Sequence, residues 1–244
     1  MVPIGGWAQN PVVPVLNQLF PDLDKNPGDA EERFTLASHF GAEKIRDTAV
    51  RLKAEWALLD GTEESSEIDF LLFRERTPIT IGNFMGYVDR GDYTNMIVHR
   101  LVSGFVIQGG GFTMSSGVDG RISAAFVSTQ PTIKNEFGVS NTLGTISMAK
   151  LGGDPDSATS QWFISTGANS DNLDSQNGGF TVFGVVSRDS FEAALELDRQ
   201  QKFTIYDLGG VFGNSALGST PLIRNTTNAN FTAERFYRFS SVVE

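Results

Sequence analysis

The spacing of apolar residues along the chain predicts many short β-strands. Residues 48–56 alternate apolar and polar side chains, and a polar turn at 61–66 separates them from the apolar run 68–73. The two segments are therefore expected to pair as a hairpin. Further β-type runs cover 96–101, 105–108, 145–148, 161–166 and 181–186, with glycine-rich or Asn/Asp-rich turns between them. The run 236–239 also has the composition of a strand, one that closes a barrel or joins a sheet edge.

Two segments have the apolar spacing of amphipathic helices. The first opens at Pro78, with Thr80 as its expected N-cap and Gly91 as its expected end. Its apolar stripe consists of Ile81, Phe84, Met85 and Val88, at positions i, i+3, i+4 and i+7. The second covers residues 190–199, and its expected inward-facing residues are Phe191, Ala194 and Leu195. Many short strands with two helices favour a mainly β fold, a closed or nearly closed antiparallel barrel with helices over its ends.

The N-terminal part of the chain differs in composition from the rest. Residues 1–33 are rich in Pro, Asn, Asp and Gly, which is typical of a loop or an extended arm. We therefore divide the chain into a largely irregular N-terminal extension, residues 1–45, and one domain, residues 46–244. The second part includes a C-terminal extension beyond about residue 205.

Composition excludes several function classes. The chain has 244 residues and a formal net charge of −10, which argues against nucleic acid as a partner because phosphate binding needs clustered Lys and Arg. It contains no cysteine, so disulfides, thiol nucleophiles and thiolate metal sites are excluded. No apolar run reaches the roughly 18 residues of a membrane span, so membrane insertion is not expected. Residues 1–10 lack the basic and apolar regions of a signal peptide.

The run from residue 98 to residue 112 carries the strongest chemical signal. It places Arg100, Phe105 and Gln108 in an apolar, β-favouring stretch that ends in three glycines. A buried arginine is costly unless it is paired, so an ion pair with a carboxylate is the first interpretation and a functional role is the alternative. His99 is interpreted as a structural histidine with satisfied hydrogen bonds. The glycines open no helix, so they indicate a turn close to neighbouring chain rather than a phosphate loop.

Other patterns do not predict a metal or a cofactor. Ser147 and Lys150 fit a Ser-x-x-Lys pattern, but they lie in a predicted strand and the companion motifs of penicillin-recognising enzymes are missing. The segment 22–26 begins like a calcium loop, but Pro27 stands where glycine is needed and Arg33 stands where glutamate is needed.

On the predicted strand 161–166, Gln161 and Phe163 share one face, and the intervening tryptophan is expected in the core.

Six blocks of this sequence resemble the cyclophilin-type peptidyl-prolyl isomerases. They are Pro78–Phe84, Val98–Arg100, Gly104–Gly110, Asn141–Ala149, Ser157–Ile164 and Phe180–Gly184, in the family's order within about residues 46–200. Segments 149–157 and 173–179 look like the bacterial branch, and Phe34–Phe40 looks like the lead-in of some secreted bacterial members. The resemblance implies a closed eight-stranded antiparallel barrel capped by two α-helices, in this chain with an extended N-terminal arm.

The resemblance also implies which residues form the site. By position, Arg100 matches the catalytic arginine, Phe105 a proline-pocket aromatic and Gln108 the pocket glutamine, and these three form the implied catalytic set. The implied substrate-binding positions are Val106, Ala149, Lys150, Gln161, Phe163, Asn172, Leu173 and Phe180.

Three of these positions depart from the common family pattern. Lys150 stands where many members have asparagine, which matters little if the backbone makes the peptide contact. Asn172 stands where many have tryptophan, so weak or no cyclosporin binding is expected. Phe180 stands where many have histidine, which makes the pocket wall more apolar.

The resemblance implies an enzyme that accelerates X–Pro rotation in polypeptides without a cofactor or a covalent intermediate. An arginine hydrogen bond to the prolyl nitrogen, made in an apolar pocket, would do this. The alternative is a non-catalytic module that binds proline-containing segments as a chaperone or assembly part. We expect a monomer that assists protein folding, located in the periplasm or secreted, and a cytoplasmic location stays open.

Overall fold

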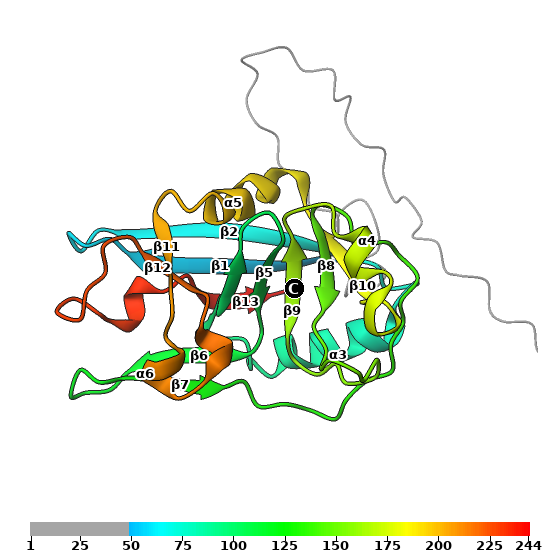
Figure 1. The fold of residues 1–244 in the computed structure, drawn as a ribbon, viewed down its shortest axis with the longest axis horizontal. Helices are drawn as coiled ribbons and strands as arrows, with labels where there is room; N and C mark the ends of the chain where they lie inside the picture. The colour runs from blue at the N-terminus through cyan, green and yellow to red at the C-terminus, as the bar shows by residue number, and fades with distance from the viewer. Residues whose placement is uncertain (1–48) are drawn as a thin grey trace, which may run out of the picture. The chain divides into compact units, whose positions relative to one another are not determined.

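The computed structural model describes residues 49–244, and the described part is mainly β (Figure 1). The strands are β1 Ala49–Ala57, β2 Glu63–Leu72, β3 Met96–Ile97, β4 Arg100–Val102, β5 Val106–Gly109, β6 Phe112–Ser116, β7 Ile122–Phe126, β8 Thr145–Met148, β9 Trp162–Ser165, β10 Val182–Val186, β11 Phe203–Tyr206, β12 Thr220–Ile223 and β13 Arg238–Val243. The helices are α3 Pro78–Asp89, α4 Ser170–Leu173, α5 Arg188–Asp198 and α6 Gly209–Phe212, with 3₁₀ turns η1 Gln176–Gly178, η2 Ser215–Leu217 and η3 Ala233–Arg235. The predicted extension, residues 1–45, lies outside the described residues.

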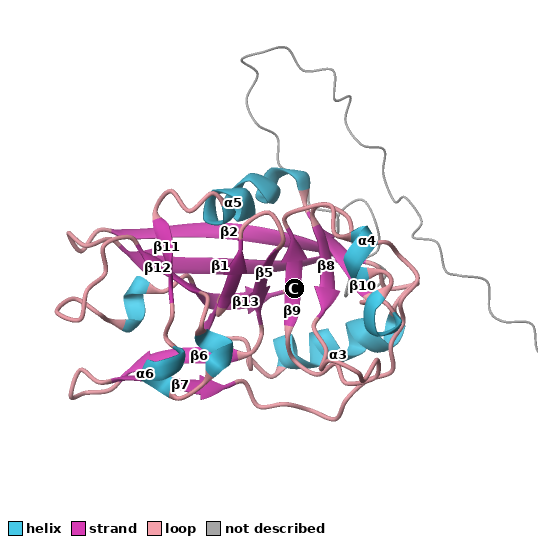
Figure 2. Ribbon diagram, viewed as in Figure 1, coloured by secondary structure: helices cyan, strands magenta, loops and turns pink. Residues whose placement is uncertain are grey.

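Eleven of the strands form one curled antiparallel sheet, a half-barrel. Its order is β4-β5-β9-β8-β10-β2-β1-β13-β3-β6-β7, and β11 and β12 form a separate pair. Helix α5 packs along β2, and the longest helix, α3, contacts β13 (Figure 2). A mainly β, antiparallel, helix-covered fold is thus confirmed. Because β4 and β7 are the two ends of this order, the closed eight-stranded barrel stays a prediction.

The predicted first hairpin is present, and alternation explains its packing. Strands β1 and β2 pair in an unbroken register from Ala49↔Leu71 to Ala57↔Glu63. Every second residue of β1 faces the core, beginning with Val50 and ending with Trp56. Strand β2 begins before the apolar run 68–73, because pairing with β1 continues into a polar, largely exposed stretch.

The two predicted helices form, with corrected ends. Thr80 is not the N-cap of α3: Thr77 takes that position, and Pro78 starts the helix with its fixed φ, as proline favours. The free N–H groups of Ile79 and Thr80 donate instead to the carboxylate of Glu136, at 3.1 and 2.8 Å. A residue 56 positions away thus takes over the role assigned to a local cap.

Helix α5 starts earlier than predicted because the Ser187 side chain caps it by accepting from the Ser190 N–H. Its core contacts also differ from the prediction. Ala194 is buried as expected, but Leu195 is only half-buried, and Leu197 is buried in its place.

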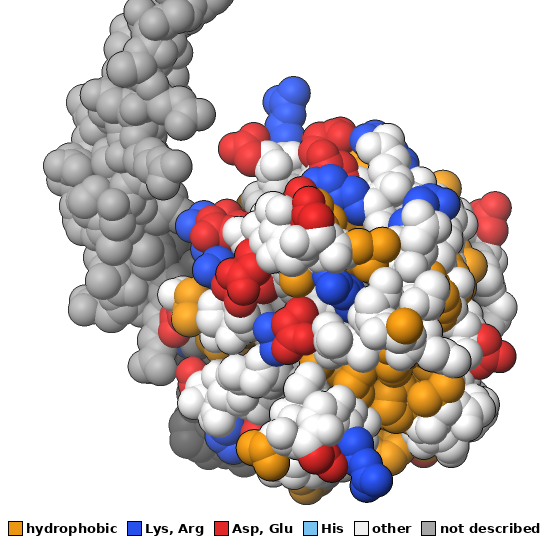
Figure 3. All heavy atoms as spheres, turned by 90° about the vertical axis from the view of Figure 1, so that its left-hand side faces the viewer, with side chains coloured by type: hydrophobic (Ala, Val, Ile, Leu, Met, Phe, Trp, Pro, Cys, Tyr) orange, Lys and Arg blue, Asp and Glu red, His pale blue; other side chains and the backbone are white. Residues whose placement is uncertain are grey.

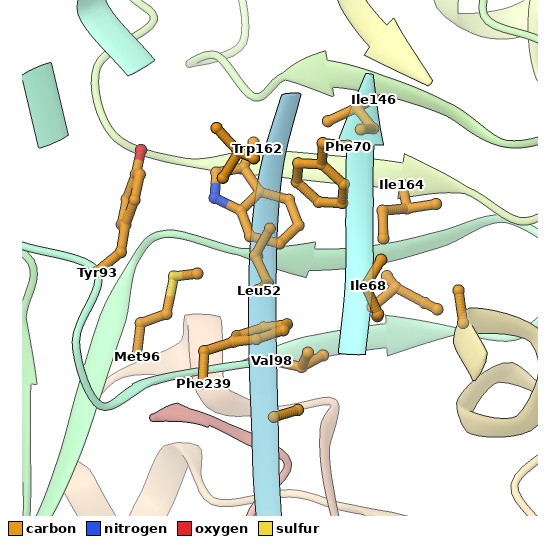
Figure 4. Packing of buried hydrophobic residues seen from close by; sticks show 14 of the residues in the cluster. Leu52, Ile68, Phe70, Tyr93, Met96, Val98, Ile146, Trp162, Ile164 and Phe239 are labelled. Atoms are coloured by element: carbon orange, nitrogen blue, oxygen red, sulfur yellow. The ribbon is translucent and has the colours of Figure 1, made fainter. Parts of the chain in front are cut away.

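The C-terminal strand is an internal member of the sheet. Strand β13 pairs with β1 on one side and with β3 on the other, so it does not lie at an edge. Its Phe239 belongs to the main core, where Trp162 contacts Phe70 and Phe239 at centroid distances of 5.2 and 6.0 Å (Figure 4). The core position predicted for Trp162 is therefore confirmed.

A second, smaller core joins the C-terminal extension to β3 and β6. It contains Ile97 and Phe112 from the sheet and Leu217, Leu222 and Phe236 from the extension. Hydrophobic side chains also reach the surface at this end of the molecule (Figure 3). Among residues 49–244, no helix is long and apolar enough to cross a membrane.

The position of β13 predicts a large stability loss for Phe239→Ala. The side chain is 1% exposed, and truncating a buried phenylalanine to alanine costs about 3–5 kcal/mol. Val243→Ala on the same strand is the control, because Val243 is 52% exposed and its truncation should change the free energy of unfolding by under about 1 kcal/mol. Chemical denaturation measures both, and similar small losses would contradict this placement of β13.

Candidate active site

Arg100 and Gln108 lie directly opposite each other on paired strands. Strands β4 and β5 are antiparallel with Arg100↔Gln108 in register, and Arg100 Nη1 donates to Gln108 Oε1 at 3.5 Å, the long end of a hydrogen bond. The guanidinium carbon is 5.8 Å from the centre of the Phe105 ring. No carboxylate of residues 49–244 lies within 4.0 Å of this half-buried arginine. The ion-pair interpretation therefore has no partner in the described part of the chain.

A row of side-chain hydrogen bonds orients Gln108. Its Nε2 donates to Gln161 Oε1 at 2.8 Å, and the Gln161 side chain and the His99 ring both lie beside Gly111. An amide that donates to one partner has its oxygen free to accept from another. The Gln161 contact thus leaves the Gln108 oxygen facing Arg100.

The glycines after Gln108 allow close backbone approach, as the sequence predicts. Gly110 has φ +77, and a Cβ atom there would lie 2.3 Å from the Ser160 carbonyl oxygen. A Cβ atom on Gly111 would lie 2.9 Å from the His99 ring and 3.0 Å from the Gln161 side chain. A larger residue would displace the Ser160 backbone at position 110 and the His99 and Gln161 side chains at position 111.

A small apolar cluster, separate from the two larger cores, lies beside these polar groups. Val106, Phe163 and Leu173 are its buried members, and Phe105, Ala149 and Phe180 pack against them half-buried. Phe163 and Phe180 meet edge to face at 5.9 Å. The structure therefore brings together six of the predicted site residues in one apolar cluster.

Lys150 has a structural contact that sequence reasoning missed. Its Nζ donates to the carbonyl oxygens of Asn177 and Gly179 at 2.9 and 2.6 Å, and lies 4.8 Å from the centre of the Phe180 ring. Burial lowers the pKa of the Lys150 amine. The ammonium group thus links the 177–179 loop to the chain just after β8 and lies against the Phe180 ring at the edge of the apolar cluster.

An open groove of about 280 Å³ continues from the polar side of the site. Four of the predicted site residues, Gln108, Ala149, Lys150 and Gln161, line it. The lining residues that the sequence did not indicate are Thr129, Thr132, Leu151, Ser157 and Thr159. They come from irregular segments, where no periodic pattern marks which side chains face inward.

Asn172 is not part of the apolar cluster. It lies exposed on the short helix α4, and its side-chain oxygen accepts from Gln176 Nε2. The neighbouring Leu173 points inward and is 6% exposed. Of the predicted site residues, Asn172 is thus the one that the structure leaves on the surface.

His99 is a buried structural residue, but the prediction that all its hydrogen bonds are satisfied is wrong. Its Nδ1 is buried and has no hydrogen-bond partner among residues 49–244, and its ring packs against Phe112 at 5.1 Å. Burial lowers the pKa of His99 to about 4, against a smaller raising effect of the bond to Gln161. The imidazole is therefore neutral at pH 7, and no second positive charge stands beside Arg100.

The lowered pKa of His99 predicts acid-sensitive stability. Between pH 6.5 and pH 4 the unfolded chain binds a proton at His99 that the folded protein does not, so the free energy of unfolding falls as pH falls through this window. From pH 7 to pH 4 the wild type should lose about 3 kcal/mol more than His99→Gln. Urea denaturation of both proteins at both pH values measures the difference. Equal losses would contradict the lowered pKa of His99 in the folded protein.

The part of the chain that carries the site residues is similar to known proteins. Residues 59–204 match the family model described as cyclophilin type peptidyl-prolyl cis-trans isomerase/CLD. The chain is 39% identical over 146 residues to peptidyl-prolyl cis-trans isomerase A of Dickeya dadantii, covering 57% of this chain and 70% of that protein. It is 39% identical over 122 residues to a peptidyl-prolyl cis-trans isomerase of Acinetobacter baylyi, covering 49% of this chain and 60% of that protein.

One solved structure similar to this chain is a Cryptosporidium parvum cyclophilin type peptidyl-prolyl cis-trans isomerase, determined in the presence of the dipeptide ala-pro. It aligns at 20% identity with a TM-score of 0.48, over 80% of this chain and 97% of that one. The family match itself covers more than half of the chain and includes every strand that carries a site residue. This chain belongs to the cyclophilin-type peptidyl-prolyl cis-trans isomerase family.

Proposed function

We propose that this protein is a peptidyl-prolyl cis-trans isomerase that accelerates X–Pro rotation in polypeptides. The observation that carries the proposal is the placement of Arg100. Its guanidinium has no carboxylate partner among residues 49–244 and lies between a polar contact, Gln108, and an apolar one, Phe105. A charged donor beside an apolar pocket is what a twisted prolyl amide requires.

The chemistry requires no bond to be made or broken. Resonance raises the barrier to peptide-bond rotation to roughly 18–20 kcal/mol, and X–Pro exchange takes tens to hundreds of seconds unaided. In the twisted state the prolyl nitrogen regains its lone pair and can accept a hydrogen bond. A donor that bonds this nitrogen more strongly in the twisted state than in the planar one lowers the barrier. Arginine suits this role because it stays charged and presents a rigid fork of donors.

The other site residues would hold the substrate. Val106, Phe163 and Leu173, with Phe105 and Phe180 at the rim, form an apolar wall for the proline ring. Gln108 and the backbone at Ala149 and Lys150 would hold the flanking peptide groups, and the open groove would take the residues next to them. Such a site uses no metal, nucleotide or general base, since no proton or group is transferred.

The second candidate function is a non-catalytic module that binds proline-containing segments. Two positions favour it. Asn172 lies outside the pocket, and Phe180 stands where many family members have histidine. The presence of Arg100, Phe105, Gln108 and Phe163 in one site favours the enzyme, and an activity assay distinguishes the two.

We also infer that the sheet closes as an eight-stranded barrel. Strands β3 and β4 belong to one run of chain, which pairs with β13 at its start and with β5 at its end. Between them, Val98 N–H donates to the Tyr237 carbonyl and His99 N–H donates to the Gln108 carbonyl, both at 3.1 Å. Counting β3 and β4 as one strand, the ring would contain β1, β2, β3/β4, β5, β8, β9, β10 and β13.

The cellular role proposed here is to assist the folding of exported proteins. The support is the similarity of residues 34–40 to the lead-in of secreted bacterial members, which favours the periplasm or secretion, while a cytoplasmic location stays open. We further propose that the protein acts as a monomer on polypeptides. The net charge of −10 supports the view that nucleic acid is not a partner.

The first prediction concerns Arg100. Arg100→Ala should lower kcat/KM on an Ala-Pro peptide by about 10²-fold, because a donor aimed at the transition state is lost. Arg121→Ala is the matched control, since its side chain is 89% exposed on the β6–β7 turn and should leave the rate unchanged. NMR exchange or a coupled assay measures the rates. If the wild type does not accelerate rotation, the isomerase proposal is wrong and the non-catalytic binding module is favoured. If wild type and Arg100→Ala have equal rates, the catalytic role proposed for Arg100 is wrong.

The second prediction concerns cyclosporin. We expect weak inhibition of the wild type, because Asn172 lies exposed where many family members have tryptophan. Asn172→Trp should strengthen inhibition by supplying an aromatic contact at this position. Titration of isomerase activity with cyclosporin tests both proteins, and tight, nanomolar inhibition of the wild type would contradict the expectation.

A further inference from the structure

Phe105 ends the turn between β4 and β5 and packs against the apolar cluster, and the buried Asp198 carboxylate accepts a hydrogen bond from the Gly104 N–H of this turn. We propose that Asp198, the last residue of helix α5, is a positioning residue that fixes this turn and thereby the Phe105 ring. The inference rests on the proposed isomerase function, because it assigns Asp198 a role in binding the proline-containing substrate.

The Asp198 carboxylate accepts hydrogen bonds from both sides of the site. The Gly104 N–H lies 3.1 and 3.2 Å from its two oxygens, and Ser103 Oγ lies 3.3 Å from Oδ2. Thr166 Oγ1, just after β9, donates to Oδ1 at 2.9 Å. One carboxylate thus joins the turn before Phe105 to the end of the strand that carries Phe163.

Three features make position 198 unfavourable for a carboxylate that lacks these hydrogen bonds. Asp198 is only 8% exposed, so its charge is largely desolvated. It stands at the C-terminal end of a helix, where the helix dipole disfavours negative charge. No cation of residues 49–244 pairs with it: the adjacent Arg199 bonds to Glu192 instead. Hydrogen bonds from the turn and from Thr166 are therefore what stabilises the carboxylate.

The chain on the other side of the turn is held as closely. The Phe105 carbonyl accepts from the Thr166 N–H at 2.9 Å and from Asn169 Nδ2 at 2.8 Å. A Cβ atom on Gly167 would lie 2.1 Å from the Gly104 carbonyl oxygen, so the two segments are in direct backbone contact. Gly104 has φ +70, a conformation that glycine adopts readily, and the Phe105 N–H closes the turn by donating to the Val102 carbonyl at 3.0 Å. With the Asp198 carboxylate removed, the Gly104 N–H loses its side-chain acceptor and Thr166 loses its contact with the turn. The Phe105 N–H bond to the Val102 carbonyl and the Ser103 Oγ bond to the Asp198 backbone carbonyl remain.

Steady-state kinetics of the full-length protein on a short Ala-Pro peptide test this role. Asp198→Ala should raise KM about tenfold with kcat changed less than about twofold, as expected when charge-assisted bonds that hold a binding wall are lost. Asp198→Asn retains one acceptor oxygen and should raise KM about threefold. Asp189→Ala is the matched control, because Asp189 lies exposed in the first turn of the same helix.

A merely structural role would give a different result. Partial unfolding lowers the active fraction, which lowers the apparent kcat and leaves KM unchanged, so that outcome in both Asp198 variants would overturn the proposal. A double-mutant cycle with Phe105→Ala supplies the second readout. If Asp198 acts through the Phe105 ring, Asp198→Asn raises KM no further in the Phe105→Ala background. An equal rise in both backgrounds would also overturn it.

Failure of the proposed function would appear separately. If the wild type has no activity, the proposed isomerase function is wrong, but binding of the same peptide can still be titrated by NMR. The dissociation constant then replaces KM, with the same expected ratios and the same contradicting outcomes.

Discussion

The antiparallel pairing of β4 with β5 is the constraint on which the site depends. It sets Arg100 across from Gln108, and the Phe105 ring, which follows the turn between the two strands, lies 5.8 Å from the guanidinium carbon. Strand β5 then pairs with β9, which brings Phe163 beside Gln108. A slip of one residue in this register would turn the arginine to the opposite face and would separate the polar donor from the apolar wall.

The side chains in contact with Arg100 and Gln108 are uncharged, and Lys150, which lines the adjacent groove, donates to backbone carbonyls instead. Gln108 and Gln161 are amides, and burial keeps His99 neutral at pH 7. In surroundings of low dielectric constant, a single guanidinium without a nearby counter-charge keeps its full hydrogen-bonding strength for a bound group. Asp198, the one buried acid among residues 49–244, accepts from the turn and from Thr166 and makes no ion pair with Arg100.

Regular segments were the easiest to predict. The first hairpin and both long helices follow from alternation or helical spacing, because their buried residues recur at regular intervals. Strand 145–148 is buried at all four positions and follows instead from its β-type composition between turns. Strands β6, β7, β11 and β12 were missed, since β7 is an edge strand with little burial and the β11–β12 pair folds onto residues far away in the sequence. The N-cap predicted for α3 was wrong for a similar reason, because the group that accepts from its first N–H groups, Glu136, comes from a distant loop.

Most of the site could be named before the fold was known, because its residues fall in short blocks of family-like sequence. Arg100, Phe105, Gln108, Gln161 and Phe163 are in this group, and the structure places them together. The surface position of Asn172, the anchoring of Lys150 and the buried carboxylate of Asp198 were decided only by the tertiary structure. Each depends on a contact between segments far apart in the chain, and neither period nor composition carries information about such contacts.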